Sequence, residues 1–154
     1  SEDSDPADVM NAMMQIHVMT PYRINLACRS MLEQEGSTTD IIHMTDYVVE
    51  KGSAKHIAYA ASKAGLAGFA RALASEWQRS VPVQLIDPPA VATDLHTRAG
   101  TPAGWARWFF LDADYAAERI FKLILTRKHT ANFGYTRQLL KRLVAGRKNK
   151  VPQS

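Results

Sequence analysis

A tyrosine, a lysine and an aspartate in the stretch 41–63 have the types and spacing of a proton-transfer site. Tyr59 and Lys63 are four residues apart, so a helix would place the phenol and the ammonium on one face. A free phenol has a pKa near ~10, and a neighbouring cation favours its ionised form. Asp46 follows an apolar run and adds a carboxylate. The stretch predicts acid–base chemistry, against the simpler interpretation of an amphipathic pair and an aspartate that caps a turn.

The elements that must position these groups are predicted to alternate between helix and strand. The pattern predicts, in order, a helix that begins at Asp5-Pro6 and is kinked or divided at Pro21, a strand at 41–44, a helix from 57 to 77 or 78, a strand at 83–87, a helix at about 113–127 capped by Asp112, and a short edge strand within 129–135. This order is typical of α/β crossover units. For residues 136–154 the pattern predicts a basic C-terminal helix and tail.

Two glycines lie inside the helix predicted from residue 57. Gly65 and Gly68 each lower helix propensity by about 1 kcal/mol relative to alanine. Alanines are frequent around them, which favours the close approach of another element. We therefore expect this helix to pack closely against a sheet or a partner subunit.

The composition excludes several classes of protein. The chain has 154 residues, of which 46% are apolar and 22% charged, as in an ordinary folded domain. No apolar run approaches the ~20 residues of a membrane helix, and the acidic start does not resemble a signal peptide. The single cysteine excludes an internal disulfide, and the histidines have no metal-ligand spacing. We expect a cytoplasmic protein with no membrane segment and no metal site.

Charge is distributed unevenly along the chain. No acidic residue follows Glu118, whereas ten lysines and arginines do. A solvated helix face with a frayed end is the simpler interpretation of this basic part, and a contact with an anionic partner is the other. Nucleic acid is not favoured as that partner, because aromatic residues are not interleaved with the basic ones.

The sequence resembles the short-chain dehydrogenase/reductase family at four places in chain order. These are MMQIHV and TPY within 13–22, with His17 at the place of a family asparagine; Asp46, thirteen residues before Tyr59, where most members carry serine; YAASK at 59–63, which matches the Tyr-x3-Lys motif; and PPAVAT at 88–93, where the family has Pro-Gly-x-Val/Ile-x-Thr. The aspartate resembles the pteridine reductases. Residues 7–75 resemble bacterial dihydromonapterin reductases within that family.

The resemblance implies the C-terminal half of a Rossmann-type doubly wound parallel sheet. Residues 1–154 are then one partial domain that begins roughly halfway through the family fold. The family binds NAD(P)H through a glycine-rich turn after its first strand. Neither G-x-G-x-x-G nor G-x-x-x-G-x-G occurs in the chain, so we expect it to bind NADPH weakly by itself.

The resemblance also implies roles for individual residues. Tyr59 would donate a proton to the group being reduced, and Lys63 would assist it and hold the nicotinamide ribose. Asp46 would orient Tyr59 or a nitrogen-rich, pterin-like substrate. For His17 two readings stay open, a catalytic residue and a core or hinge histidine.

The stretch 88–93 would meet the cofactor. Pro88, Val91 and Thr93 are implied to contact NADPH, the last two at its carboxamide. Proline at 89 departs from the family glycine, since it removes a backbone N–H and restricts φ.

Two functions remain open from the sequence. The first is an NADPH-dependent oxidoreductase that reduces a dihydropterin. The second is a non-catalytic remnant of such a reductase that acts as an interaction module. In both cases the chain is expected to form a homo-oligomer through the helix at 57–78.

Overall fold

The computed structural model describes residues 5–34, 39–46, 49, 56–77, 80–88, 91, 111–127 and 130–132. Its elements are α1 (Pro6–Met14), the π-helical turn η1 (Gln15–Met19), α2 (Thr20–Leu32), β1 (Ile41–Met44), α4 (Ile57–Trp77), β2 (Val83–Asp87), α6 (Ala113–Leu125) and β3 (Thr130–Asn132). The predicted order of helices and strands is confirmed in this part of the chain. The basic helix and tail predicted for 136–154 lie outside it.

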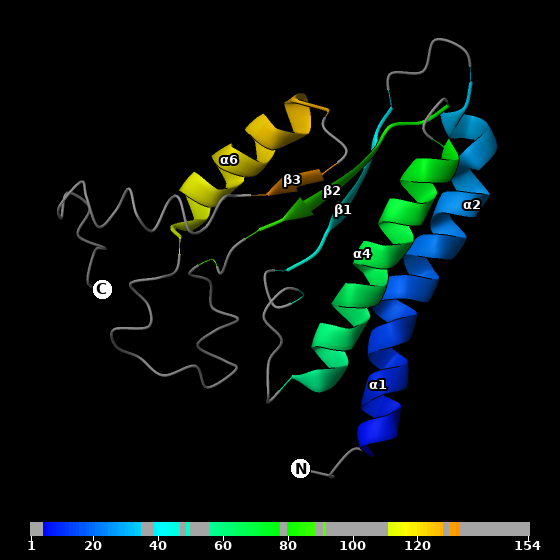
Figure 1. The fold of residues 1–154 in the computed structure, drawn as a ribbon, viewed down its shortest axis with the longest axis vertical. Coiled ribbons are helices and arrows are strands. Elements are labelled where there is room, and N and C mark those ends of the chain that lie inside the picture. The colour runs from blue at the N-terminus through cyan, green and yellow to red at the C-terminus, as the bar shows by residue number, and fades with distance from the viewer. Residues whose placement is uncertain are drawn as a thin grey trace, which may run out of the picture.

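The three strands form one parallel sheet in the order β1-β2-β3. Helix α4 connects the first two strands and α6 connects the last two, on opposite faces of the sheet (Figure 1). The side chains of β2 alternate accordingly: Leu85 packs against Ala67 and Ala70 of α4, and Ile86 packs against Leu111 and Ala116 on the α6 side. A parallel sheet with both faces covered confirms the predicted α/β fold.

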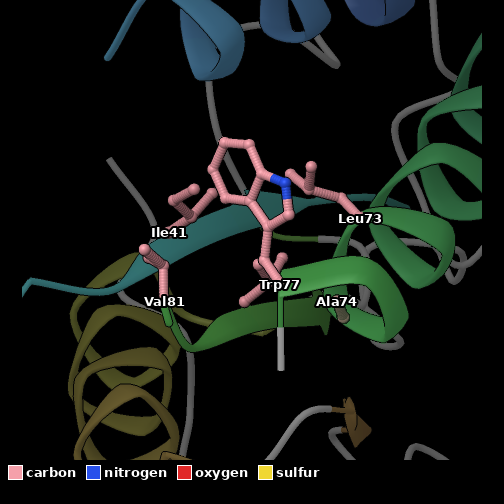
Figure 2. Close-up of a cluster of buried hydrophobic side chains, with 6 residues drawn as sticks. Ile41, Leu73, Ala74, Trp77 and Val81 are labelled. Atoms are coloured by element: carbon pink, nitrogen blue, oxygen red, sulfur yellow. The ribbon is translucent and has the colours of Figure 1, made fainter. Parts of the chain in front are cut away.

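Trp77 anchors the C-terminal end of α4 to the sheet. Its ring is 1% exposed and lies in a cluster with Ile41 of β1, Val81, Leu73 and Ala74 (Figure 2). The N–H of Val81 donates to the Trp77 carbonyl at 3.0 Å, which holds the turn into β2 against the helix end. The direction of α4 across the sheet is thereby fixed by a buried aromatic residue at one end.

The N-terminal helix is continuous through the predicted kink. Asp5 caps it, with Oδ1 accepting the Ala7 N–H at 2.9 Å. Pro21 has no N–H that could donate to a carbonyl one turn back. Directly before it the helix contains a π-helical turn, in which the Thr20 N–H donates to the Gln15 carbonyl. The kink or division expected at Pro21 is therefore a widened turn, and His17 lies inside it.

Gly65 allows this widened turn to approach α4. A Cβ added at Gly65 would lie 3.0 Å from Val18 Cγ2 and 3.7 Å from Met14 Cε. Gly65 thus packs against another helix of its own chain, which corrects the expectation of a sheet or a partner subunit at this glycine. Gly68 is exposed, and a Cβ there would meet no described atom within 4 Å.

The two glycines form a matched pair for a stability test. Gly68→Ala should raise the free energy of unfolding by about 1 kcal/mol, because alanine gains helix propensity without a clash. Gly65→Ala should gain less or lose stability, because its methyl group meets Val18. Urea unfolding measures both. An equal gain in the free energy of unfolding for the two variants would contradict the packing of Gly65 against Val18. In a Val18→Ala background the difference between the two variants should become smaller.

A buried polar pair joins α2 to β1. Asn25 and His43 are 7% and 8% exposed, and Asn25 Nδ2 lies 3.0 Å from His43 Nε2. An amide nitrogen only donates, so Nε2 accepts and the imidazole is neutral. Burial lowers the pKa of His43 below its ordinary value of 6.5. Protonation of His43 would create a positive charge in this buried place. It would also remove the lone pair on Nε2 that accepts the hydrogen bond from Asn25.

Stability should therefore fall at mildly acid pH. Above pH 6.5 His43 is neutral in both the folded and the unfolded chain, so its contribution is complete. Below 6.5 the unfolded chain takes up a proton first, and the free energy of unfolding decreases until the lower folded pKa is reached. Urea unfolding from pH 7.5 to 5.5 measures the slope.

The control for this slope is His43→Gln, made in a His17→Asn background because the pKa of His17 is lowered as well. Glutamine does not titrate, so the pH dependence of the free energy of unfolding should be shallower in the double variant than in His17→Asn alone. An unchanged slope would show that His43 is not responsible.

Candidate active site

The candidate residues converge where β1 and β2 end and α4 begins. Asp46 follows β1, and Tyr59 lies in the first turn of α4. The Tyr59 hydroxyl donates to Asp46 Oδ2 at 2.8 Å. In parallel α/β sheets this carboxyl edge is where ligands bind. The thirteen-residue spacing in the sequence therefore becomes a direct hydrogen bond between a phenol and a carboxylate.

Lys63 ties α4 to the end of the first strand. Its Nζ donates to the Met44 carbonyl at 3.2 Å and lies 5.8 Å from the centroid of the Tyr59 ring. Burial lowers the pKa of Lys63, and the charge of Asp46 acts in the opposite direction. The ammonium is thus held by a carbonyl and a ring face in a partly desolvated place.

His17 reaches the same place from the π-helical turn. Its Nδ1 lies 2.8 Å from Ser62 Oγ, and its ring meets the Tyr59 ring edge to face with centroids 5.6 Å apart. Burial, followed by the charge of Lys63, lowers the pKa of His17. The structure therefore brings all four predicted catalytic residues together.

Two further groups that sequence reasoning did not assign lie beside them. Ser62 precedes Lys63 in the sequence and is fully buried, but only the fold brings His17 to it. Thr45 is 3% exposed, and its hydroxyl donates to the Asp87 carboxylate at the end of β2. This contact joins the two strand ends directly before Asp46. No sequence signal marks it, because the partners are distant in the chain.

The residues implied to meet the cofactor are described only in part. Pro88 directly follows β2 at the same edge. Val91 forms a bridge with Leu111 and packs partly buried against the cluster under α6. Thr93 and Pro89 lie outside the described residues.

The part of the chain that the structure describes contains neither a candidate metal site nor a candidate membrane segment. No three histidine, cysteine, aspartate or glutamate side chains there are grouped to hold a metal ion. No described helix combines the length and apolar character that crossing a bilayer requires. The cellular compartment stays a prediction.

Fold and site together define an α/β protein with polar groups at the carboxyl edge of a parallel sheet. Residues 1–103 match the sequence model of the family described as short chain dehydrogenase. This match covers more than half of the chain. The chain belongs to the short chain dehydrogenase family.

The curated relatives in this family include dihydromonapterin reductases. Those of Escherichia coli K12 and Shigella sonnei are each 50% identical to the chain over 94 residues. The alignment covers 60% of this chain and 39% of either relative. The chain thus spans about two fifths of the length of the relatives that it matches.

Solved structures agree with the fold. A short-chain dehydrogenase from Sphingobium yanoikuyae in complex with NADPH superposes with a TM-score of 0.70 at 16% identity, over 97% of this chain and 61% of that one. A chain described as a short chain dehydrogenase from Escherichia coli CFT073, complexed with NADPH, gives 0.56 at 26% identity, over 65% and 41%. The first shows the fold alone. Both agree with a partial Rossmann-type α/β fold.

The electrostatic coupling of Lys63 to Asp46 gives a direct test of the site geometry. Asp46→Asn should lower the pKa of Lys63 further, because it removes the negative charge that favours the ammonium while burial remains. Titration of the Lys63 side-chain resonances by NMR measures this. Glu118→Gln, beside the exposed Lys122, should leave Lys63 unchanged. A Lys63 pKa that does not fall in Asp46→Asn would contradict the arrangement.

Proposed function

We propose that the chain is the proton-donor part of an NADPH-dependent oxidoreductase that reduces a dihydropterin. The observation that carries the proposal is the 2.8 Å hydrogen bond from Tyr59 to Asp46, beside Lys63 and His17 at the carboxyl edge of the sheet. A phenol that donates to a carboxylate, with an ammonium over its ring, is suited to acid–base chemistry. The family and the 50% identity to dihydromonapterin reductases support the reaction class and the substrate.

The reaction would add a hydride and a proton across a C=N bond of the pterin ring. The Tyr59 proton, which is directed at Asp46 Oδ2 in the structure, would be redirected to the substrate nitrogen, so the Tyr59 O–H bond breaks as the N–H bond of the product forms. Lys63 would stabilise the tyrosinate that remains. Asp46 would hold the phenol in position and accept a hydrogen bond from the amino-substituted ring, which a serine at this place would do without a charge.

The residues present fit a nicotinamide cofactor at this edge. Lys63 has further donors on Nζ besides the one given to Met44, and Tyr59 lies beside it, so the two side chains would hold a ribose through its hydroxyl groups. Pro88, Val91 and Thr93 would line the nicotinamide side. The bound cofactor would supply the hydride.

The function is tested by replacing the proposed proton donor. Because the sequence has no glycine-rich turn, NADPH is supplied at millimolar concentration and its oxidation is followed with a dihydropterin. Tyr59→Phe should lower the rate by about 10²-fold or more, the usual range for a lost general acid. Tyr115→Phe, an exposed tyrosine on α6, should not change it. Equal rates in the two variants would contradict the role of Tyr59.

A second function, as an interaction module, is favoured by the exposed side of the N-terminal helices and α4. Apolar side chains are exposed along α1, η1 and α2, among them Ile16 at 61% and Met31 at 58%. On α4 many of the exposed positions are small, namely Ala61, Ala64, Gly68, Ala72 and Ser75. Small residues let a second helix approach closely, so we propose a homo-oligomer through α4, whether or not the chain is catalytic.

A charge on the exposed face of α4 tests the oligomer. Ala64→Glu should convert an oligomer into a monomer, because a carboxylate would be buried in the new contact without a partner. Ala117→Glu, at an exposed position of α6, is the matched control and should leave the mass unchanged. Sedimentation velocity measures the mass. A wild-type chain that is monomeric at high concentration would contradict the proposal.

A further inference from the structure

Ser62 determines which nitrogen of His17 carries the proton. The Ser62 hydroxyl donates to the Tyr59 carbonyl, one helical turn back, at 2.9 Å. A hydroxyl has one proton, so toward His17 the same oxygen has only lone pairs to offer. His17 Nδ1 lies 2.8 Å from that oxygen. Nδ1 therefore carries a hydrogen and donates it.

The burial of Ser62 supports this assignment. Ser62 is fully buried, so water does not compete for its hydroxyl within the helix. A buried hydroxyl and an imidazole nitrogen at this distance must pair as donor and acceptor. The alternative, in which Ser62 donates to His17, would remove its bond to the Tyr59 carbonyl.

The state of the other ring nitrogen follows. Burial and the nearby Lys63 ammonium lower the pKa of His17, so the ring is neutral at neutral pH. A neutral imidazole has one N–H. With Nδ1 protonated, Nε2 has a lone pair, on a ring that contacts the Tyr59 ring edge to face. The site thus contains a proton acceptor on a ring that packs against the ring of Tyr59.

We propose that Ser62 is a positioning residue that holds His17 as the Nδ1–H tautomer, so that His17 Nε2 relays protons to Tyr59. Its use in turnover rests on the proposed function. After Tyr59 has given its proton to the substrate, Nε2, protonated from solvent, would return one by way of a water molecule: the Nε2–H bond breaks, the water accepts that proton and gives up another, the Tyr59 O–H bond forms, and the imidazole is neutral again. Ser62 keeps Nδ1 occupied throughout, so protons enter and leave at Nε2 alone.

The tautomer is read directly by nitrogen NMR on the full chain, without cofactor or substrate. In a chain labelled with ¹⁵N-histidine, His17 is assigned by the loss of its signals in His17→Asn. At pH 8 we expect Nδ1 as the protonated nitrogen and Nε2 as the bare one. A wild-type His17 that is mainly Nε2–H would overturn the proposal.

Variants separate positioning from a general effect on folding. In Ser62→Ala the Nδ1–H form loses its acceptor, so the Nε2–H form should rise from the minor to the major species. Ser80→Ala is the matched control, since Ser80 also donates to a carbonyl three residues back, that of Trp77, and makes no contact with His17. It should leave the His17 tautomer unchanged. An Nδ1–H majority in Ser62→Ala would overturn the proposal.

Two outcomes remain interpretable if a variant fails. Ser62→Thr keeps the hydroxyl and should keep the Nδ1–H form, which covers the case that alanine does not fold. Because these readings need no turnover, a chain with the Nδ1–H tautomer and no reductase activity would contradict the proposed function while supporting the role of Ser62. An active enzyme with the Nε2–H tautomer would do the reverse.

Discussion

The packing of α4 between the sheet and the N-terminal helix is the constraint on which the site depends. One side of α4 rests on β2 through Ala67 and Ala70 against Leu85. Another side meets η1 at Gly65, where even a methyl group would press on Val18. These two contacts fix the rotation of α4 about its axis. Its first turns then direct Tyr59 toward Asp46, and Ser62 toward His17.

The site balances charges within a partly desolvated space. Lys63 and Asp46 carry opposite charges around one phenol, while His17 is neutral at rest because burial and Lys63 both disfavour its cation. A neutral histidine beside a charged lysine avoids a second positive charge next to Tyr59. This division of roles follows from burial and distance rather than from residue type alone. On an exposed surface, where water screens charges, the same side chains would shift one another's pKa values much less.

Much of the fold was predictable because its signals are local. The apolar run at β2, the proline and aspartate at the start of α1, and the aspartate that caps α6 each act within a few residues. The placement of Tyr59 and Lys63 on one face followed from helical periodicity in the same way. The widened turn before Pro21 was expected only as a kink or a division of the helix, because a proline shows that the hydrogen-bonding pattern must change and not which pattern replaces it.

What the sequence did not predict depends on contacts between distant segments. Ser62 has a role only because His17, far upstream, is brought to it, and Thr45 because β2 lies beside β1. Gly65 was recognised as a close-packing position, but its neighbour was misassigned, because propensity shows that packing is required and not what provides it. The catalytic assignments themselves still rest on the family resemblance and on the geometry at the sheet edge.

The central claim is that the carboxyl edge of the sheet, at Asp46, Tyr59 and Lys63, receives a pterin-like molecule. The chain spans 39% of the length of its dihydromonapterin reductase relatives, so binding by the chain itself is the direct measurement. A dihydropterin is titrated into the ¹⁵N-labelled chain with NADPH at millimolar concentration, and amide shifts are followed. The account predicts saturable shifts confined to Asp46, Asp87 and the first turns of α4. Shifts absent there, or confined to α6, would contradict it.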